Sequence, residues 1–452
     1  MTLLNELSAE VCQRARMSRD PRFDGRFFVA VKTTGIFCRP ICPANLPKEE
    51  NVEYFSSQAL AVSAGYRPCL RCRPESAPHS WAWKGAETTF LRALTLIEQG
   101  ELDGSLETLA SRLGISDRYL RQLFQRHLGM PPKQYAQIQQ LMFAKQLLHT
   151  SQISITEVAY ASGFQSTRRF NDAFQKLFRL TPTQVRRERA ALPSRNHLSL
   201  AFRGPFDWAH MLDFYRLRAI EGMELVDEQS YQRHFVLGEG TGWFKASMAH
   251  SHLDIEFEME RLSDLRHLVA RLRRMFDLDA DLISIEAHLE QVAPGLVRRT
   301  GIRIPGVWNA WEAGVRAVLG QQVSVKAAIG QLNLLVSTLA ASEGSTRYFP
   351  TPEQVQMSDL SFLRMPERRK ETLKRLADYV RLHPMDSPMA WLSLSGIGPW
   401  TVDYAQLRGE SRSHCFLTGD LIVKKALAKF PQLTAESVAP WGSYATFHCW
   451  SH

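Results

Sequence analysis

Four closely spaced cysteines limit the folds available to this chain more than any other feature. Three residues separate Cys38 from Cys42, and two separate Cys69 from Cys72. Each pair suits one metal ion, because thiolates bind Zn²⁺ at about 2.3 Å in a tetrahedral array, and the loop between the pairs is long enough to bring them together. The spacing therefore predicts a single Zn²⁺ held by all four thiolates. Spacing alone favours a structural zinc and does not exclude a reactive one.

Length and composition describe an ordinary multidomain protein. At 452 residues the chain is too long for one hydrophobic core, which favours about three domains. No apolar run is long enough to cross a membrane, and the first residues lack the basic start and apolar core of a signal peptide. We therefore expect a cytoplasmic protein, in which clustered cysteines bind metal rather than form disulfides.

Positive charge is concentrated in the first part of the chain. Residues 1–195 contain 27 lysines and arginines against 17 acidic residues, whereas residues 196–452 contain 28 against 29. The net charge of +9 thus comes from the N-terminal part. Because cationic side chains release counterions when they neutralise a polyanion, this distribution favours DNA as a partner. A basic surface that serves only solubility would not be concentrated in this way.

Between about residues 81 and 190, apolar residues follow a helical period in two similar copies. In each copy, an apolar helix leads to a turn glycine and then to a serine, Ser116 or Ser166, that caps a second helix. A long helix from Pro132 to His149 is expected to join the copies. This pattern predicts two helix-turn-helix motifs, whose second helices suit successive major grooves about 34 Å apart.

The second copy resembles the AraC-type regulators, in its Ala-x3-Gly-Phe-x-Ser-x3-Phe pattern and in the Thr181-Pro182 that follows. That family binds DNA through both second helices. Arginine can reach guanine edges, and glutamine or asparagine can reach adenine edges, although each can instead contact phosphate. The candidate DNA-binding residues are Arg118, Arg121, Gln122 and Arg126 in the first copy and Thr167, Arg168, Asn171 and Gln175 in the second.

A Gly-Ile-Gly-Pro segment near the C-terminus predicts a helix, a tight hairpin and a second helix. Gly396 and Gly398 flank one residue, and Pro399 stands where a helix would begin. The free N–H groups of the hairpin, with the helix dipole behind them, can bind a phosphate. Further along, Asp420 precedes an apolar helical run. A plain turn and a helix N-cap are the alternative interpretation, but the combination indicates chemistry on a nucleic acid.

Residues 396–404 resemble the helix-hairpin-helix DNA glycosylases. Their Trp-Thr-x2-Tyr pattern is similar to the 3-methyladenine glycosylase II (AlkA) type, and residues 206–208 and 308–325 extend the likeness over nearly the whole C-terminal half. The resemblance implies removal of alkylated purines, with Asp420 stabilising an oxocarbenium-like sugar or orienting water. Relatives that also cut the strand have a lysine in place of Trp400, so base removal without lyase activity is expected.

The same resemblance assigns roles to further residues. Trp400, Tyr404 and Trp450 would line the base pocket, where stacking on a positively charged purine gains about 0.5–2 kcal/mol. A lone tryptophan more commonly packs in a core. Some relatives have an apolar wedge where Gln322 stands, so this chain departs from their pattern at the gap left by a flipped base. The implied DNA-binding residues of this half are Gly396, Gly398, Gln321 and Gln322.

The cysteine segments 33–40 and 65–72 resemble the N-terminal domain of the Ada adaptive-response family. In that family, the thiolate matching Cys38 irreversibly takes a methyl group from a methylated DNA phosphate. Four thiolates on Zn²⁺ leave a net charge of about −2, which keeps the sulfur nucleophilic, and methylation would lower it and tighten DNA binding. Neither Cys415 nor Cys449 lies in the Pro-Cys-His-Arg sequence of the second Ada activity, so repair of methylguanine oxygen is not expected.

Together these patterns predict a multidomain, mainly α protein. The expected order is a small α+β zinc domain, an AraC-type double helix-turn-helix, and an α+β glycosylase whose small antiparallel sheet precedes a helix-hairpin-helix domain. The predicted domains cover residues 1–80, 81–190, 196–300 and 301–452.

The predicted function is DNA-alkylation repair joined to an adaptive response. The chain would be a monofunctional glycosylase for purines such as 3-methyladenine and 7-methylguanine, with one Zn²⁺, a methyl-accepting Cys38 and a transcription-regulator domain. Expected partners are double-stranded DNA with alkylation damage, promoter DNA and RNA polymerase, for a monomer at the bacterial nucleoid without membrane contact. Two alternatives stay open: an activator that senses methylphosphotriesters and whose C-terminal half binds without excision, and a zinc-stabilised binding module without methyl transfer.

Overall fold

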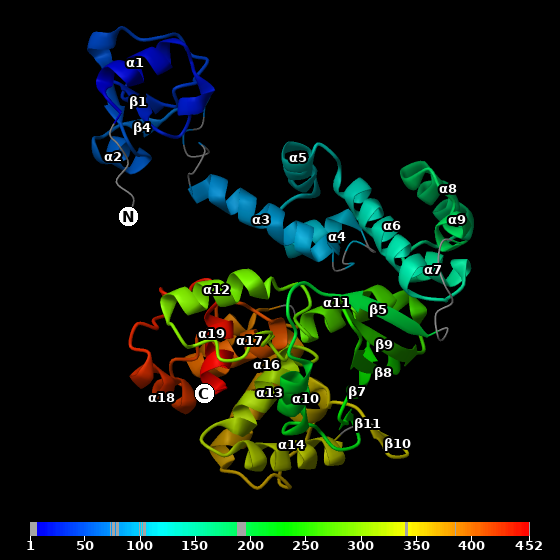
Figure 1. Ribbon diagram of the computed structural model, residues 1–452. Helices are drawn as coiled ribbons and strands as arrows, with labels where there is room; N and C mark the ends of the chain where they lie inside the picture. Colours follow the sequence, from blue (N-terminus) through cyan, green and yellow to red (C-terminus); the bar gives the residue numbers. More distant parts are fainter. Residues whose placement is uncertain are drawn as a thin grey trace. The chain divides into compact units, whose positions relative to one another are not determined.

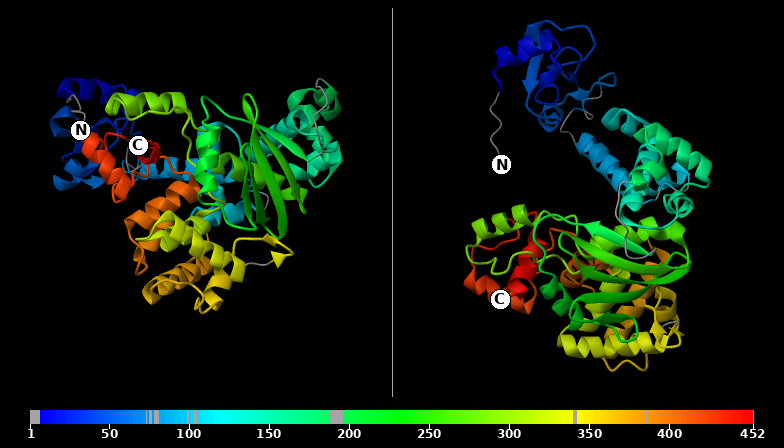
Figure 2. Two further views of the ribbon diagram at one scale, coloured as in Figure 1. Left: turned by 60° about the horizontal axis from the view of Figure 1, so that its bottom comes forward. Right: turned by 45° about the vertical axis from the view of Figure 1, so that its right-hand side comes forward.

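The protein is described by a computed structural model that covers residues 7–72, 74, 77, 81–98, 100, 102, 105–187, 196–339, 342–384 and 386–451. Its elements form two compact units, Met1–Gln137 and Ile138–His452 (Figures 1 and 2). Within the described residues, none of the helices combines the length and hydrophobicity that a membrane crossing requires.

The first unit begins with a small sheet flanked by short helices. Its elements are α1 (Ala9–Met17), η1 (Pro21–Phe23), β1 (Phe28–Val31), β2 (Ile36–Cys38), η2 (Glu49–Asn51), β3 (Val52–Phe55), α2 (Gln58–Ser63) and β4 (Arg67–Pro68). The strand order is β3-β1-β2-β4, with β2 and β4 parallel. Because side chains alternate along β1, Val29 joins Cys12 in one small core, whereas Phe28 joins Phe37 in another.

Three helices form the first helix-turn-helix copy in the same unit. They are α3 (Trp81–Glu98), α4 (Leu106–Arg112) and α5 (Asp117–Leu128). The Ser116 hydroxyl accepts a hydrogen bond from the Tyr119 N–H, which confirms the predicted cap of α5. Leu120 and Phe124 are fully buried, so α5 is anchored by its apolar face and its polar face stays exposed.

The long helix expected between the copies is α6 (Pro132–Thr150), which begins in the first unit and ends in the second. The second copy follows with α7 (Ile155–Ala161), α8 (Thr167–Phe178) and α9 (Pro182–Arg187). Ser154 and Glu157 form a reciprocal capping box at the start of α7. Ser166 accepts from the Arg169 N–H and caps α8, as predicted.

The predicted antiparallel sheet of the second unit has five strands in the order β5-β9-β8-β7-β6. They are β5 (His197–Ala201), β6 (Glu224–Val226), β7 (Ser230–Leu237), β8 (Gly240–Met248) and β9 (His252–Met259). Leu253, Ile255 and Phe257 of β9 are buried, whereas Glu256 and Glu258 between and after them are exposed. Two helices, α10 (Trp208–Arg216) and α11 (Leu265–Met275), contribute side chains to the same core.

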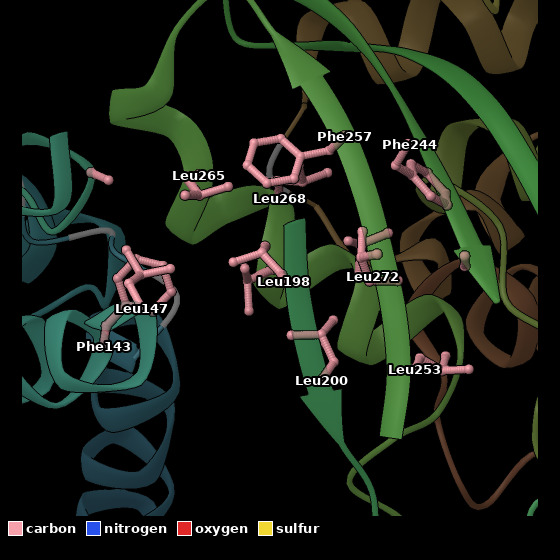
Figure 3. Close-up of a cluster of buried hydrophobic side chains, with 14 of the residues drawn as sticks. Phe143, Leu147, Leu198, Leu200, Phe244, Leu253, Phe257, Leu265, Leu268 and Leu272 are labelled. Atoms are coloured by element: carbon pink, nitrogen blue, oxygen red, sulfur yellow. The ribbon is translucent and has the colours of Figure 1, made fainter. Parts of the chain in front are cut away.

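This core also reaches the second helix-turn-helix copy (Figure 3). Leu198 of β5, Phe257 of β9 and Leu265 of α11 belong to one cluster of buried apolar side chains. Phe143 and Leu147 of α6 belong to the same cluster. In the second unit, the second helix-turn-helix copy and the five-stranded sheet therefore share one hydrophobic core.

Most of the remaining elements of the second unit contribute to two further buried cores, one of which contains α13. In chain order, the remaining elements are η4 (Leu262–Asp264), α12 (Leu282–Val292), α13 (Ala310–Gly320), α14 (Val325–Leu339), β10 (Ser342–Glu343), β11 (Thr346–Arg347), α15 (Pro352–Met357), α16 (Glu367–Leu382), η5 (Pro388–Ser393), α17 (Pro399–Glu410), α18 (Leu421–Lys429) and α19 (Gly442–Trp450). Where a first helix was expected before the hairpin, the structure has the six-residue 3₁₀ helix η5.

Four buried charges join the sheet to α13. Arg233 of β7 contacts Glu224 at 2.9 Å and Glu312 at 2.5 Å, and Arg316 contacts the same two carboxylates at 3.0 and 2.8 Å. Burial would raise the pKa of Glu312, but the two guanidinium groups outweigh burial and hold that pKa at about 2. Because an unfolded glutamate titrates near about 4.3, the stabilisation is present at neutral pH and is lost as the pH falls from about 4 toward about 2.

Replacing Glu312 with glutamine should lower the free energy of unfolding by about 3–5 kcal/mol at neutral pH, because two buried guanidinium groups lose a shared carboxylate. Urea-induced unfolding of the full chain, followed by tryptophan fluorescence, measures this loss. Glu371→Gln is the control, since it breaks an exposed pair with Arg375 on α16 and should cost less than about 1 kcal/mol. Similar losses in the two variants would contradict the stabilising role of the buried network.

Candidate metal centre and aromatic cavity

The four cysteines of the first unit converge as predicted. The sulfurs of Cys38, Cys42, Cys69 and Cys72 all lie within 4.8 Å of one another. Four sulfurs placed about 2.3 Å from one ion in a tetrahedron fit this spacing. An all-thiolate donor set is the one that Zn²⁺ favours in structural sites, so the residues present fit the metal.

Backbone pairing brings the two cysteine pairs together. Strand β2 ends at Cys38, and its neighbour β4 ends just before Cys69. The Cys69 N–H donates to the Phe37 carbonyl at 2.9 Å, which fixes the second pair beside the first. The Arg39 N–H donates to the Cys72 sulfur at 3.3 Å. Parallel pairing of two short strands therefore creates the site from segments that are distant in sequence.

The arginines near the cysteines differ in their availability. Arg39 donates from Nε to Asp24 at 2.8 Å and from Nη1 to the Cys72 carbonyl at 3.3 Å. The hydrogen bond with Asp24 raises the pKa of Arg39, despite the opposing effect of burial. Arg67 and Arg71 are exposed. Arg39 thus braces the site, while the other two can meet a phosphate.

The predicted DNA-reading side chains lie on the exposed faces of α5 and α8. Thr167 is half-buried at the start of α8. Arg121 forms an ion pair with Asp117 at 2.6 Å, one helical turn earlier, which orients its guanidinium along α5. The residues that are exposed are Arg118, Arg121, Gln122, Arg126, Arg168, Asn171 and Gln175.

The Gly-Ile-Gly-Pro segment forms a tight hairpin at the start of α17. Gly398 is the N-cap, and Pro399 occupies the first position of the helix, as predicted. Gly396 has φ of +93°, and a Cβ at this position would lie 2.0 Å from the Thr372 hydroxyl oxygen on α16. Only glycine meets both conditions. The hairpin is therefore pressed against α16, with its backbone N–H groups at the N-terminus of α17.

The loop between α13 and α14 is tied to this hairpin. The Gln321 amide nitrogen donates to the Gly396 carbonyl and to the Thr401 hydroxyl, both at 3.1 Å. Gln322 is exposed and adopts the left-handed region, with φ of +58°. A non-glycine residue held in this region is strained, and such residues cluster at binding sites. Gln322 is thus exposed to solvent, while the adjacent Gln321 is held by its hydrogen bonds to Gly396 and Thr401.

Trp400, Tyr404, Trp450 and Asp420 line one cavity of about 390 Å³ in the second unit. The rings of Trp400 and Tyr404 are stacked, with centroids 5.3 Å apart. The structure therefore brings together the three aromatic residues predicted for the base pocket and the carboxylate predicted to be catalytic. A planar base has a volume well below that of the cavity and can stack against such rings.

Asp420 is both the N-cap of α18 and a wall of this cavity. Its Oδ1 accepts from the N–H groups of Ile422 and Val423 at 2.8 and 3.1 Å and from the Trp450 indole at 3.1 Å. Among the described residues, all three bonds are made by Oδ1, and Oδ2 has no protein donor. Oδ1 of Asp420 thus serves as the helix cap, and Oδ2 is the oxygen that is available for the predicted catalytic role.

Sequence reasoning missed the contribution of α10 to the cavity. Phe214 lies nearly parallel to Trp450, with ring centroids 6.3 Å apart. Arg218 and His210 also line the cavity, and burial lowers the pKa of His210. The available signal was the four-residue spacing of Phe214 and Arg218, which places both on one face of a helical turn.

Three stretches of the chain match known families. Residues 11–75 match the metal binding domain of Ada, residues 109–188 match a helix-turn-helix domain, and residues 197–309 match the AlkA N-terminal domain. The first match covers all four converging cysteines, which make this a site for one Zn²⁺.

Curated relatives are similar to this chain over nearly its whole length or over one part of it. The probable bifunctional transcriptional activator/DNA repair enzyme AlkA of Mycobacterium tuberculosis is 34% identical over 98% of this chain and 96% of its own length. DNA-3-methyladenine glycosylase 2 of Escherichia coli is 33% identical over 56% of this chain and 96% of its own length. The bifunctional transcriptional activator/DNA repair enzyme Ada of Escherichia coli is 35% identical over 38% of this chain and 47% of its own length. The chain belongs to the family of AlkA-type bifunctional transcriptional activators and DNA repair enzymes, which combine an Ada-type zinc domain, a helix-turn-helix regulator and a DNA-3-methyladenine glycosylase II.

Proposed function

We propose that this chain repairs alkylated DNA in two ways and reports the damage to a promoter. Its C-terminal half hydrolyses the N-glycosidic bond of alkylated purines, and its zinc domain accepts a methyl group from a methylated phosphate. The observation that carries the proposal is the aromatic cavity, which is lined by the stacked rings of Trp400 and Tyr404 and by Asp420, whose Oδ2 accepts no hydrogen bond from the described residues. A carboxylate with no protein donor on one oxygen is available to a developing positive charge.

In the glycosylase reaction, the hairpin at Gly396–Pro399 anchors a phosphate, and the loop with Gln322 enters the gap that the flipped nucleotide leaves. Flipping costs a few kcal/mol, which a damaged base reduces. The base then stacks in the cavity against Trp400 and Tyr404, while the Asp420 carboxylate faces the sugar. As the C–N bond breaks, the carboxylate stabilises the oxocarbenium-like sugar or orients the attacking water. Because no amine stands at Trp400, no Schiff base forms and the strand stays intact.

In the methyl transfer, the Cys38 sulfur attacks the methyl carbon of a phosphotriester. A C–S bond forms, the C–O bond breaks, and the phosphodiester leaves with the negative charge. When bound, Zn²⁺ keeps the four thiols deprotonated at neutral pH. The exposed Arg67 and Arg71 bind the charged phosphates that flank the neutral phosphotriester, whereas Arg39 stays paired with Asp24.

Transfer of the methyl group also switches the chain. The site loses one negative charge, which removes repulsion from the DNA backbone and tightens binding. The exposed faces of α5 and α8 then read the promoter, with Arg118, Arg121 and Gln122 on one helix and Arg168 and Asn171 on the other. We propose that the methylated chain contacts RNA polymerase at the promoter. It acts as a monomer in the cytoplasm, at the nucleoid, where its DNA partner lies.

One experiment tests both chemistries. The Zn²⁺-loaded full chain is incubated with duplex DNA treated with a methylating agent, free bases are separated by chromatography, and the peptide that contains Cys38 is mapped by mass. The proposal requires released methylpurines and one added methyl group on this peptide. Methylated protein without released bases would favour the activator whose C-terminal half only binds, and neither product would favour a zinc-stabilised binding module.

A further inference from the structure

Arg218 places an unneutralised positive charge on the wall of the aromatic cavity. It follows the end of α10, and its guanidinium carbon lies 3.7 Å from the centroid of the Phe214 ring. Its Nη1 donates to the Phe214 carbonyl at 3.3 Å, which holds the group beside the cavity. Burial lowers the pKa of Arg218 to about 10, so the side chain remains a cation at neutral pH.

The other charged groups of the cavity are already engaged or lie at different places. Arg316, the second arginine of the wall, contacts both Glu224 and Glu312. Asp213 pairs with Arg216 on its own helix. In the part of the chain that the structure describes, no carboxylate contacts Arg218, so its charge stays available to whatever occupies the cavity.

The same cation acts on the nearby phenol. Burial alone would raise the pKa of Tyr404, but Arg408, Arg218 and Arg316 outweigh burial and hold that pKa below its usual value. Arg408 also donates to the Tyr404 hydroxyl at 2.9 Å. A phenol that accepts from one guanidinium becomes a stronger donor through its own proton. The cavity wall therefore contains a group of hydrogen-bond donors, Arg218 and Tyr404, as well as the Asp420 carboxylate, which accepts hydrogen bonds.

These donors do not favour the release of a cationic alkylpurine. It leaves the sugar as a neutral base, and a guanidinium beside it repels the charge that it carries before the bond breaks. A neutral base leaves with the electron pair of the C–N bond and becomes an anion, unless a group nearby stabilises or protonates it. Donors that are aimed at a developing negative charge in a partly dry site are among the largest contributions to catalysis.

We infer that Arg218 is a specificity-determining residue that donates a hydrogen bond to the acceptor edge of a neutral, carbonyl-bearing lesion base. The inference rests on the proposed glycosylase function and deepens it. In the step, the C–N bond breaks, its electrons pass to the base nitrogen, and water supplies hydroxide to the sugar carbon. The water proton ends on the base, while Arg218 keeps its own proton. The ligand class is a neutral purine with an exocyclic oxygen, for which hypoxanthine is the probe.

The test compares two leaving bases in one sequence context. Single-turnover release of hypoxanthine and of 7-methylguanine from otherwise identical duplexes is measured for the full chain and for Arg218→Met, which keeps an unbranched side chain without charge. Release of hypoxanthine should fall about 100-fold, the usual effect of losing one oxyanion donor. Release of 7-methylguanine should stay the same or rise, because repulsion of the cationic base is relieved.

Two further variants separate specificity from folding. Arg218→Lys keeps the charge without the planar fork and should restore part of the hypoxanthine rate. Arg381→Met removes an exposed arginine of α16 that pairs with Asp378, outside the cavity lining, and should leave the ratio of the two rates unchanged. A structural role for Arg218 would lower both rates together in Arg218→Met.

Each remaining outcome overturns the inference. Equal losses for both bases, an unchanged ratio, or a wild-type chain that releases 7-methylguanine but no hypoxanthine would each exclude this role of Arg218. If the wild-type chain released neither base, the glycosylase proposal itself would fail and the inference with it. Release of 7-methylguanine by the wild-type chain therefore distinguishes the two failures.

Discussion

Asp420→Asn should lower the rate of 3-methyladenine or 7-methylguanine release by roughly 100-fold or more, with little loss of folding stability. The structure explains why the two effects separate. The amide oxygen of asparagine can replace Oδ1 and accept from the Ile422 and Val423 N–H groups and from the Trp450 indole. Only Oδ2 changes, from an oxygen that shares the negative charge to a neutral NH₂ group. The variant thus removes transition-state stabilisation and preserves the helix cap.

Single-turnover kinetics on a duplex with one lesion measure this loss without interference from product release. Asp403→Asn is the matched control, because Asp403 lies on α17 next to Tyr404 but does not line the cavity. That control should release bases at close to the wild-type rate. An Asp420→Asn chain that kept about a third of the wild-type rate, or more, would remove this carboxylate from the mechanism.

The sequence was informative wherever local chemistry decides the structure. The serine caps Ser116 and Ser166 begin helices as predicted, because an N-cap is set by residues within one turn. The four cysteines converge, because ligand spacing and metal geometry leave few alternatives. Gly396 and Pro399 form the expected hairpin for the same local reason. Their assignment to DNA binding goes beyond local structure and stays a prediction.

What the sequence did not reveal depends on contacts between distant segments. Arg39 and Arg67 look alike as basic neighbours of the cysteines, and only the fold places Asp24 against Arg39 and leaves Arg67 exposed. Phe214 and Arg218 precede Trp400 by most of the glycosylase half, yet they share its cavity. No local pattern encodes such neighbours, since tertiary packing selects them.

The shared core of the second unit was also beyond the reach of pattern reasoning. The predicted boundary between the regulator and the glycosylase lies near residue 195, where the sequence changes in charge. In the structure, Phe143 and Leu147 of α6 belong to the same buried cluster as Leu198 of the sheet. Apolar periodicity identifies the buried face of each element but does not specify which neighbour covers it.

Cys38→His should abolish methyl transfer from methylphosphotriester DNA while the chain still binds one Zn²⁺. The structure narrows the choice of nucleophile. Cys42 is buried, and the sulfur of Cys72 already accepts the Arg39 N–H, which lowers its nucleophilicity. Cys38 is partly exposed, and among the described residues no backbone N–H donates to its sulfur. Histidine replaces a thiolate in many zinc sites, so this variant removes the nucleophile and keeps a fourth ligand.

Transfer of a labelled methyl group from DNA, together with the zinc content of the purified chain, measures both parts of the expectation. Cys42→His is the control: it makes the same change of ligand at the buried position and should retain transfer, because the Cys38 thiolate is unchanged. If Cys38→His lost its zinc, the loss of methyl transfer could result from a damaged metal site. The mass of the methylated wild-type peptide would then identify the cysteine that accepts the methyl group. A methyl group found on Cys72 of the wild-type chain would contradict the argument from exposure and hydrogen bonding, and one found on Cys69 would contradict the assignment of the nucleophile to Cys38.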